Sequence, residues 1–397
     1  MVRKEKIESQ EGVIIQTATD LLRLAALNAA SDIHLEPEDK ILRIRLRVDG
    51  VMRELETHEI SMHSPLLSRF KVMAGLDIAE SRKPQDGRFN TSLDGKQYDV
   101  RVSTFPTIYG ENMVLRLLDK SRVLMGLEYL GFAQDQLEEW EKLIHQPYGI
   151  LFVSGPNGSG KTTSLYATLN AINSPDKTIV TLEDPVEYQL PMIRQTQAGG
   201  DISFANGLRS LLRQDPDIIL VGEIRDRDTA EIAIRAALTG HLVLTTIHTN
   251  DAVGAITRLV DMGIERVLIA SATIGVMAQR LVRVLDDETK ESYDAPDEIV
   301  KELGLPAGKP VQLYRPSPDA TRAEGGGYSG RSGLFELFKV DKNIRNMIIA
   351  GSPGQEMLQY AKEKGMLTLR QDGIAKAMAG MTSIEEVLRV TTGIDVH

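Results

Sequence analysis

The segment 155–163, GPNGSGKTT, matches the phosphate-binding pattern G-x-x-x-x-G-K-[ST]. Glycines let successive backbone N–H groups turn inward around phosphate oxygens, and the helix expected next favours anions at its N-terminus. Lys161 can then reach the β- and γ-phosphates, and Thr162 can ligate Mg²⁺. The apolar run 149–153 precedes the loop as a buried strand should, which favours a nucleoside triphosphate site over a glycine-rich turn in an ordinary α/β domain. The residues predicted to contact the nucleotide are Gly155, Pro156, Asn157, Gly158, Ser159, Gly160, Lys161, Thr162 and Thr163.

Acidic residues follow two of the predicted strands. One strand ends with Glu183, Asp184 and Glu187, and another delivers Glu223. Ligands gather at the carboxyl ends of parallel strands, so these carboxylates are expected near the phosphates. Gly222 stands where many P-loop proteins place a Mg²⁺-binding aspartate, so we expect Glu223 to orient or activate water. Glu183, or one of its two acidic neighbours, is then expected to help hold the metal, unless this segment is only a capped loop with surface acids.

Two histidines flank a further predicted strand. His241 precedes the strand and His248 follows it. Near a nucleotide, His248 can report the γ-phosphate by hydrogen bonding. Their spacing of seven residues does not form a recognisable metal-binding pair, and a structural role is the alternative for each.

The composition sets limits on the class of protein. The chain has 397 residues, 42% of them apolar, which is enough for two or three domains with ample cores. No stretch approaches the roughly 18 unbroken apolar residues that span a bilayer. The N-terminus shows no signal peptide, so a cytoplasmic location is expected. The absence of cysteine excludes disulfides and thiolate metal sites, and the net charge of −10 argues against broad nucleic-acid binding.

Sequence patterns divide the chain into five parts. A helix over 17–29, alternating apolar and basic residues over 41–48, and strands near 97–102 and 112–118 predict a small α+β domain. Later strands alternate with helices such as 228–238, which predicts parallel βαβ units. Those later strands are expected at 150–153, 178–182, 218–221 and 242–246. The predicted parts are an N-terminal domain at 1–120, a linker at 121–147 that is mostly the charged helix 134–144, an ATPase core at 148–283, an insertion at 284–332, and a C-terminal helical region at 333–397.

These sequence motifs, in their order along the chain, resemble those of the traffic ATPases. The traffic ATPases are the motors of type II secretion and type IV pilus assembly. The resemblance rests on the phosphate-binding loop, LEDPVE at 182–187, LLRQDPD at 211–217 with Gly222 and Glu223, and GHLVLTTIH at 240–248. In addition, SDIHLEP at 31–37, RVDG at 47–50 and KPQDGR at 83–88 resemble the N-terminal domain of that family. The resemblance therefore covers nearly the whole chain.

The resemblance implies an α/β fold with a RecA-like P-loop core, a PAS-like N-terminal α+β domain that closes over the nucleotide, and a homohexameric ring. Arginines of the closing domain approach the phosphates in such rings, and Arg101 and Arg116 match them, with Arg88 a weaker candidate. Arg209 and Arg213, four residues apart on an expected helix face, match core arginines that point toward the ring interface. Guanidinium groups brought in by closure would offset transition-state charge. A surface salt bridge is the alternative for each arginine.

Two features depart from the family pattern. Most secretion and pilus-extension members bind zinc through two CxxC pairs, whereas the matching places here read DDET at 286–289 and ATRA at 320–323, so no zinc is expected. The insertion is then either mobile or packed through Tyr314 and Tyr328. The additional N-terminal domain that contacts the membrane platform in many members has no match in this chain.

The resemblance implies an ATPase that uses ATP and Mg²⁺, with Thr162, Glu183 and Glu223 near the metal. It also implies a cytoplasmic motor that does not insert into the membrane. Such a motor would reach the inner membrane through platform and docking proteins. Secretion and pilus extension are not separated by these motifs. The alternatives are a nucleotide-gated scaffold with little turnover, a nucleic-acid translocase, which the acidic charge disfavours, and a small-molecule kinase, for which no second substrate site is suggested.

Overall fold

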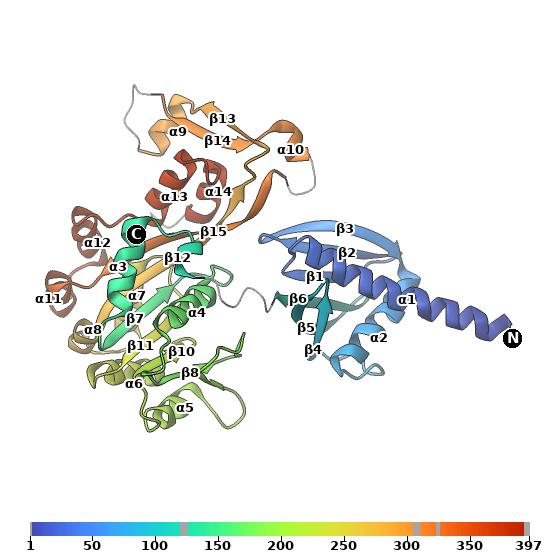
Figure 1. Cartoon of the computed structure of the whole chain (residues 1–397), viewed down its shortest axis with the longest axis horizontal. Coiled ribbons are helices and arrows are strands. Elements are labelled where there is room, and N and C mark those ends of the chain that lie inside the picture. Colours follow the sequence, from blue (N-terminus) through green and yellow to red (C-terminus); the bar gives the residue numbers. More distant parts are fainter. Residues whose placement is uncertain (1, 120–125, 305–309, 323–325, 393–397) are drawn as a thin grey trace. The chain divides into compact units, whose positions relative to one another are not determined.

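The computed structural model describes residues 2–119, 126–304, 310–322 and 326–392 (Figure 1). The chain divides into two compact units, Met1–Val123 and Leu124–His397, and each is described by itself. Residues 120–125, which include the last residue of the predicted N-terminal domain and the start of the predicted linker, lie outside the described residues.

The first unit contains helices α1 (Val2–Leu27) and α2 (His63–Ala74) and a six-stranded sheet in the order β3-β2-β1-β6-β5-β4. All pairs in this sheet are antiparallel. The strands are β1 (Asp32–Pro37), β2 (Ile41–Val48), β3 (Val51–Glu59), β4 (Gln85–Leu93), β5 (Lys96–Thr107) and β6 (Gly110–Asp119). The predicted helix 17–29 and the predicted strands are thus present.

Alternation along β2 explains how this sheet is covered. Leu42, Ile44 and Leu46 are buried, whereas the arginines between them are partly exposed. The buried side chains pack in one core with Leu21 of α1 and Phe70 of α2. Because side chains alternate between the faces of a strand, the opposite face carries the polar and basic residues. The alternation of apolar and basic residues over 41–48 thus corresponds to a strand with one buried face.

The second unit is built on a seven-stranded sheet in the order β15-β12-β7-β11-β10-β8-β9. The four strands predicted from the sequence are β7, β8, β10 and β11, and they form the contiguous parallel centre of this sheet. The strands are β7 (Gly149–Ser154), β8 (Ile179–Glu183), β9 (Arg194–Gln197), β10 (Ile218–Val221), β11 (Leu242–Ile247), β12 (Thr273–Leu285) and β15 (Tyr328–Lys339). Helices α4 (Lys161–Ile172), α5 (Phe204–Leu211), α6 (Arg227–Leu238), α7 (Ala252–Asp261) and α8 (Arg266–Ala272) connect and flank them (Figure 1).

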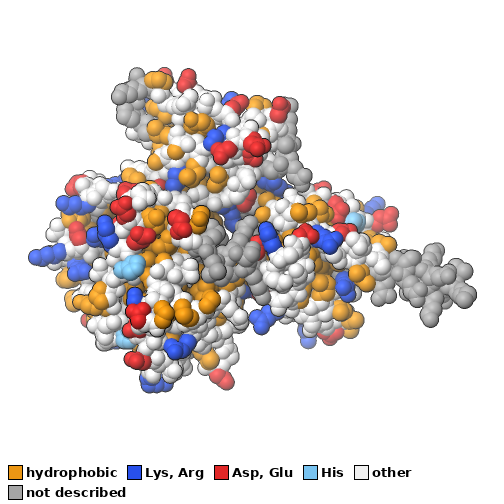
Figure 2. Space-filling view, in the orientation of Figure 1, with side chains coloured by type: hydrophobic (Ala, Val, Ile, Leu, Met, Phe, Trp, Pro, Cys, Tyr) orange, Lys and Arg blue, Asp and Glu red, His pale blue; other side chains and the backbone are white. Residues whose placement is uncertain are grey.

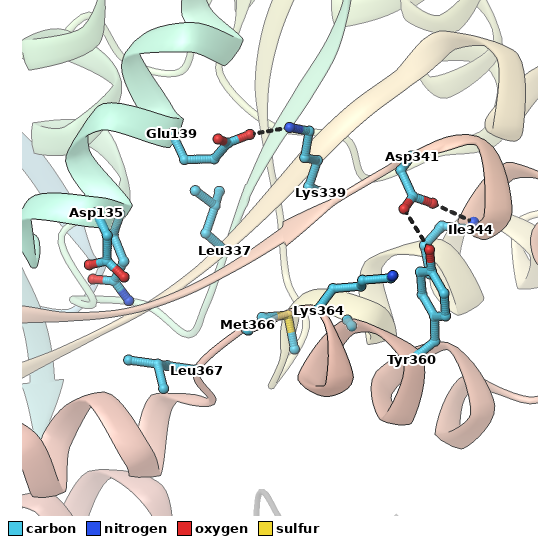
Figure 3. A pocket seen from close by; sticks show the side chains of 13 residues that line it. Asp135, Glu139, Leu337, Lys339, Asp341, Ile344, Tyr360, Lys364, Met366 and Leu367 are labelled. Atoms are coloured by element: carbon cyan, nitrogen blue, oxygen red, sulfur yellow. Dashed lines mark hydrogen bonds and ion pairs between the residues drawn. The ribbon is translucent and has the colours of Figure 1, made fainter.

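Helix α3 (Gln134–Ile144) occupies the segment predicted as a linker but packs within the second unit. Trp140 is fully buried, and its Nε1 donates to Thr168 Oγ1 at 3.0 Å. Glu139 and Lys339 form an ion pair at 2.5 Å, which ties α3 to β15 beside a cavity of about 270 Å³ (Figure 3). The apolar stripe of this charged helix therefore anchors it to the core, which its charge pattern alone did not indicate.

The end of the chain is less uniformly helical than predicted. Residues 328–339 form β15, which pairs antiparallel with β12 over most of its length. This segment forms a core strand because its apolar side chains are buried, with Leu334, Phe335 and Phe338 fully so. The predicted helical region begins only after this strand. Its helices are α11 (Lys342–Ala350), α12 (Gly354–Glu363), α13 (Leu369–Met378) and α14 (Ile384–Thr391), and residues 393–397 lie outside the described part.

The predicted insertion forms a small packed subdomain. Strands β13 (Lys290–Asp294) and β14 (Gln312–Pro316) pair antiparallel beside the short helices α9 (Asp297–Glu302) and α10 (Pro318–Arg322). Leu313 shares a core with Ile374 and Val387 of α13 and α14. Tyr328 hydrogen-bonds Ser383 at 2.8 Å, and Tyr314 packs against Gly380. Packing through the two tyrosines, one of the two expectations, is thus observed.

Candidate nucleotide-binding site

The phosphate-binding loop connects β7 to α4 and requires its glycines. Gly155 has φ +148°, and a Cβ there would lie 2.5 Å from Ser159 Oγ and 2.6 Å from Gln279 O. Gly160 has φ +88°, and a Cβ there would lie 2.7 Å from Gln279 Nε2. L-residues with a side chain rarely adopt such φ values. The loop is therefore a cradle that any other residue at these two positions would fill or strain.

The residues of the cradle fit a phosphate with its Mg²⁺. The Ser159 hydroxyl is buried and has no hydrogen-bond partner within the described residues. Thr162 and Thr163 are exposed in the first turn of α4, where backbone N–H groups lack intrahelical partners. Hydroxyl and backbone donors of this kind suit phosphate oxygens, and the Thr162 hydroxyl would be available to the metal.

Lys161 bends back onto the loop. Its Nζ donates to Gly155 O at 2.8 Å and to Pro156 O at 2.9 Å. Burial lowers the pKa of Lys161 to about 8, while the negative charge of Glu223 opposes this shift and the positive charge of Arg280 adds to it. The ammonium group thus has carbonyl partners that phosphate oxygens can replace, and both Glu223 and Arg280 lie within its electrostatic reach.

Glu223 and His248 follow neighbouring parallel strands. Val221 of β10 pairs with Thr245 of β11, so the residues after these strands emerge at one edge of the sheet. His248 Nε2 lies 3.5 Å from Glu223 Oε2, and Arg225 forms a second ion pair with the same carboxylate. The structure thus brings together the predicted water-orienting acid and the predicted phosphate sensor.

His241 lies at the other end of β11. Its Nδ1 is 2.9 Å from Ala236 O, and its own carbonyl accepts from Gly149 N at 3.1 Å. These contacts link α6, β11 and the start of β7, far from the carboxyl ends of the strands. The structural alternative therefore describes His241.

Glu183 is enclosed rather than open to a metal. Its side chain is buried and accepts hydrogen bonds from Thr181 Oγ1 at 2.5 Å, from Gln195 Nε2 at 3.2 Å and from the Tyr166 hydroxyl. Burial raises the pKa of Tyr166 above its ordinary value, and the adjacent Glu183 carboxylate adds to the increase. This geometry ties β8 to α4, and contact with metal or water would require Glu183 to exchange partners.

The neighbouring positions differ in how far they are exposed. Asp184 is exposed, and the backbone N–H of Glu187 donates to the Tyr166 hydroxyl at 3.2 Å. At Gly222 a Cβ would lie 3.2 Å from Glu183 Cα and 3.3 Å from Leu182 O. A side chain at this position would therefore be crowded by β8, and the first acid after β10 is Glu223.

The two core arginines lie around the end of α5. Arg209 donates to Asn206 Oδ1 at 3.0 Å, and Arg213 donates to the Arg209 carbonyl at 2.9 Å. Both side chains are exposed. The prediction of one shared helix face was wrong in detail, because α5 ends at Leu211 and Arg213 lies in the turn that follows.

Three arginines of the first unit form a row on adjacent strands. Arg101 of β5 is directly opposite Arg116 of β6 on one side and Arg88 of β4 on the other. The two predicted closing arginines and the weaker candidate therefore share one face of the sheet.

The sequence analysis did not identify the residues of β12 that lie beside the phosphate-binding loop. Gln279 Oε1 accepts from Ser164 Oγ of α4 at 2.8 Å, and Arg280 donates to Asn250 O at 2.8 Å. Burial lowers the pKa of Arg280 below its ordinary value. The signal that could have found these residues is the run 273–285, whose apolar and β-branched content is typical of a strand.

A model of the family described as "Type II/IV secretion system protein" matches residues 7–389. The chain belongs to this family. It is 48% identical over 386 residues to the type II secretion system protein E of Pseudomonas aeruginosa, covering 97% of this chain and 76% of that protein. It is 46% identical over 391 residues to the type II secretion system ATPase E of Vibrio cholerae, covering 98% and 77%.

Another relative of this secretion-family chain is the type IV pilus assembly ATPase PilB of Thermus thermophilus, 45% identical over 389 residues, covering 97% of this chain and 44% of that one. The crystal structure of the pilus retraction motor PilT with bound ADP matches with a TM-score of 0.62 at 26% identity, covering 94% and 96%. The ATPase DotB of Legionella pneumophila matches with a TM-score of 0.68 at 21% identity, covering 94% of each chain, and this likeness concerns the fold alone. The RecA-like fold class and the family resemblance are confirmed, and the chain is an ATPase.

The two segments that stand at the places of the zinc-binding pattern differ in how far the structure describes them. Asp286–Thr289 forms the turn between β12 and β13, where Lys290 N donates to Asp286 O at 2.9 Å, and Ala323 lies outside the described residues. Within the described ranges, no group of three or more His, Cys, Asp or Glu side chains is arranged to hold a metal ion. In the same part of the chain, no helix combines the length and the apolar character needed to cross a membrane.

Proposed function

We propose that this chain is the ring-forming motor of a type II secretion or type IV pilus-assembly machine, and that it uses ATP hydrolysis to do mechanical work. The observation that carries this proposal is the convergence of Lys161, Glu223 and His248 at the carboxyl edge of the parallel sheet. Lys161 lies within electrostatic reach of Glu223, and His248 lies 3.5 Å from the same carboxylate.

The roles follow from these positions. Lys161 would exchange its two carbonyl partners for β- and γ-phosphate oxygens. Glu223 would orient the attacking water. His248, whose Nε2 lies 3.5 Å from the Glu223 carboxylate, would sense the γ-phosphate. Thr162, with Glu183 or Glu223 nearby, would hold Mg²⁺, which when bound neutralises charge on the phosphates. Glu183 would act mainly by fixing α4 through Tyr166.

Assembly would complete the site. Arg101 and Arg116, with Arg88 beside them, would offset the charge that develops on the phosphates when the N-terminal domain closes. Arg209 and Arg213 would face the neighbouring subunit of a homohexamer. Because catalysis would then depend on domain position, each turnover would move one domain. The ring would lie in the cytoplasm and transmit this motion to a platform protein of the inner membrane and its cytoplasmic docking partner.

Turnover tests the site directly. Purified protein with Mg²⁺ and ATP should release phosphate, and Glu223→Gln should lower kcat by about 10²-fold or more, because one positioned base or electrostatic group is worth this much. An unchanged kcat would remove Glu223 from the mechanism.

A nucleotide-gated scaffold is the second candidate, favoured by the enclosure of Glu183, which limits the acids available for chemistry. Stimulation of turnover by the cytoplasmic domain of a platform protein supports the motor and excludes the scaffold. A nucleic-acid translocase is less favoured, since acidic and basic side chains are interspersed on the face shown in Figure 2 and the net charge is −10.

A further inference from the structure

One register row crosses five strands of the first unit. From β2 to β4 its members are Arg47, Asp32, Arg116, Arg101 and Arg88, each directly opposite the next. The row thus places three arginines on consecutive antiparallel strands, with Asp32 at one end of the three.

Such a row is costly by itself. Residues directly opposite on antiparallel strands have Cβ atoms about 4.5–5.5 Å apart, and like charges there are destabilising. Asp32 is the acid of this row, and it sits between Arg47 and Arg116.

The pair formed by Asp32 and Arg116 is asymmetric. Arg116 Nε donates to Asp32 Oδ1 at 2.9 Å, yet the Asp32 side chain is 7% exposed and that of Arg116 is 61% exposed. The other carboxylate oxygen, Oδ2, accepts from Ser31 Oγ at 2.7 Å and lies 3.8 Å from Arg47 Nε. The carboxylate is therefore fixed by its own strand and by β2, while the guanidinium it holds faces solvent.

Anchoring through Nε leaves a particular part of the guanidinium for recognition. Arginine carries five N–H donors in a rigid plane, one on Nε and four on Nη1 and Nη2, and the four can by themselves bind two phosphate oxygens. A contact at Nε fixes the plane without using these four donors. A surface ion pair formed for stability alone would gain little at this exposure.

The geometry points to Asp32 as a positioning residue, which orients Arg116 toward a phosphate oxyanion of the bound nucleotide. This inference rests on the proposed role of Arg116 in hydrolysis. Asp32 does not touch the nucleotide and acts only through Arg116. Its loss therefore lowers kcat more than it raises KM for ATP.

The same two strands provide a matched control. Glu36 is another acid of β1. Its two carboxylate oxygens accept from Arg45 of β2 at 2.6 and 2.8 Å, in a bidentate pair. This pair lies outside the row that contains Arg116. Glu36→Gln therefore reports the cost of removing an ion pair from this sheet without disturbing Arg116.

The test is a double-mutant cycle in the full chain, with kcat and KM for ATP and the thermal midpoint measured for each variant. We expect Arg116→Ala to lower kcat about 10²-fold, since it removes one transition-state donor. Asp32→Asn should lower kcat about tenfold, because Arg116 remains but loses its fixed geometry. The double variant should equal Arg116→Ala, and Glu36→Gln should stay within about twofold of the wild type.

Each outcome is decisive. A further tenfold loss from Asp32→Asn in the Arg116→Ala background would show that Asp32 does not act through Arg116 and would overturn the inference. An unchanged kcat for Asp32→Asn with a large loss for Arg116→Ala would overturn the inference and leave the proposed function standing. No loss for Arg116→Ala would instead reject the role proposed for Arg116. Should Asp32→Asn fail to fold, Arg116→Lys, which keeps the charge and removes Nε and the plane, must lose at least tenfold in kcat, and full activity would contradict the inference.

Discussion

The Glu223 carboxylate lies 3.5 Å from Nε2 of His248, across the ends of two neighbouring parallel strands. The proposed phosphate sensor therefore contacts the proposed water-orienting acid. On the proposed mechanism, loss of the imidazole would remove the γ-phosphate contact and one neighbour of the Glu223 carboxylate.

The first prediction compares the two histidines that flank β11. His248→Ala should lower kcat by about tenfold or more, since general acid–base and polar groups in such sites typically contribute this much. His241→Ala is the matched control, because its ring contacts Ala236 O at the opposite end of the strand. Steady-state phosphate release measures both, and equal losses would contradict the assignment of His248.

A second prediction concerns the pH dependence of nucleotide binding. The pKa of Lys161 is about 8 in the free protein, and phosphate oxygens would raise it, so binding takes up a proton at pH 8 and above. Affinity for ATP should be constant below pH 8 and fall above it, by up to about tenfold per pH unit. Titration calorimetry in two buffers of different ionisation enthalpy measures the proton uptake. Absence of uptake at pH 9 would contradict the depressed pKa, and Lys161→Ala should bind ATP weakly at every pH.

The enclosure of Glu183 predicts an effect on stability. Tyr166→Phe removes one donor to a buried carboxylate, so the free energy of unfolding should fall by about 1–3 kcal/mol. Tyr129→Phe is the control, because Tyr129 is 68% exposed and should change stability by less than about 0.5 kcal/mol. Urea denaturation of both variants provides the comparison. Equal midpoints would show that the Tyr166 hydroxyl does not support Glu183.

Glu336 of β15 predicts a pH-dependent stability. Burial raises its pKa from 4.5 to about 7, although its carboxylate accepts from Ala252 N at 2.8 Å and Leu369 N at 3.3 Å. From pH 4.5 to about 7 the unfolded chain ionises this group while the folded chain keeps the proton, so stability is lost as pH rises. The slope is at most about 1.4 kcal/mol per pH unit.

Glu336→Gln removes this titration. The stability of the wild type relative to the variant should therefore decrease between pH 5 and pH 7.5 and then stay constant. Urea denaturation at several pH values measures this difference. A difference that does not change with pH would mean that Glu336 ionises normally in the folded protein.

Much of the core of the second unit could be predicted because its signals are local. Each of β7, β8, β10 and β11 is a short apolar run, and polar residues with ligand chemistry follow it directly. Parallel strands of this kind are buried on both faces, so their sequences are almost continuously apolar. For this reason the sequence predicts that Glu223 and His248 follow the carboxyl ends of their strands.

Elsewhere the prediction failed where the deciding contacts are distant in sequence. Trp140 on α3 donates a hydrogen bond to Thr168. Strand β15 pairs with β12, although the insertion separates the two strands in sequence. Glu183 ends the expected strand, but its partner Tyr166 lies on α4 and Gln195 on β9. Motif spacing records which residue follows a strand and does not record which donors enclose it.

If Glu223 serves hydrolysis and not the binding of nucleotide, its substitution should separate the two. The most direct measurement is phosphate release by purified Glu223→Gln protein beside its affinity for ATP, each with Mg²⁺ and each compared with the wild type. We predict a loss in kcat of about 10²-fold or more with ATP affinity kept within about threefold. Turnover equal to that of the wild type would contradict the account, as would loss of ATP binding together with turnover.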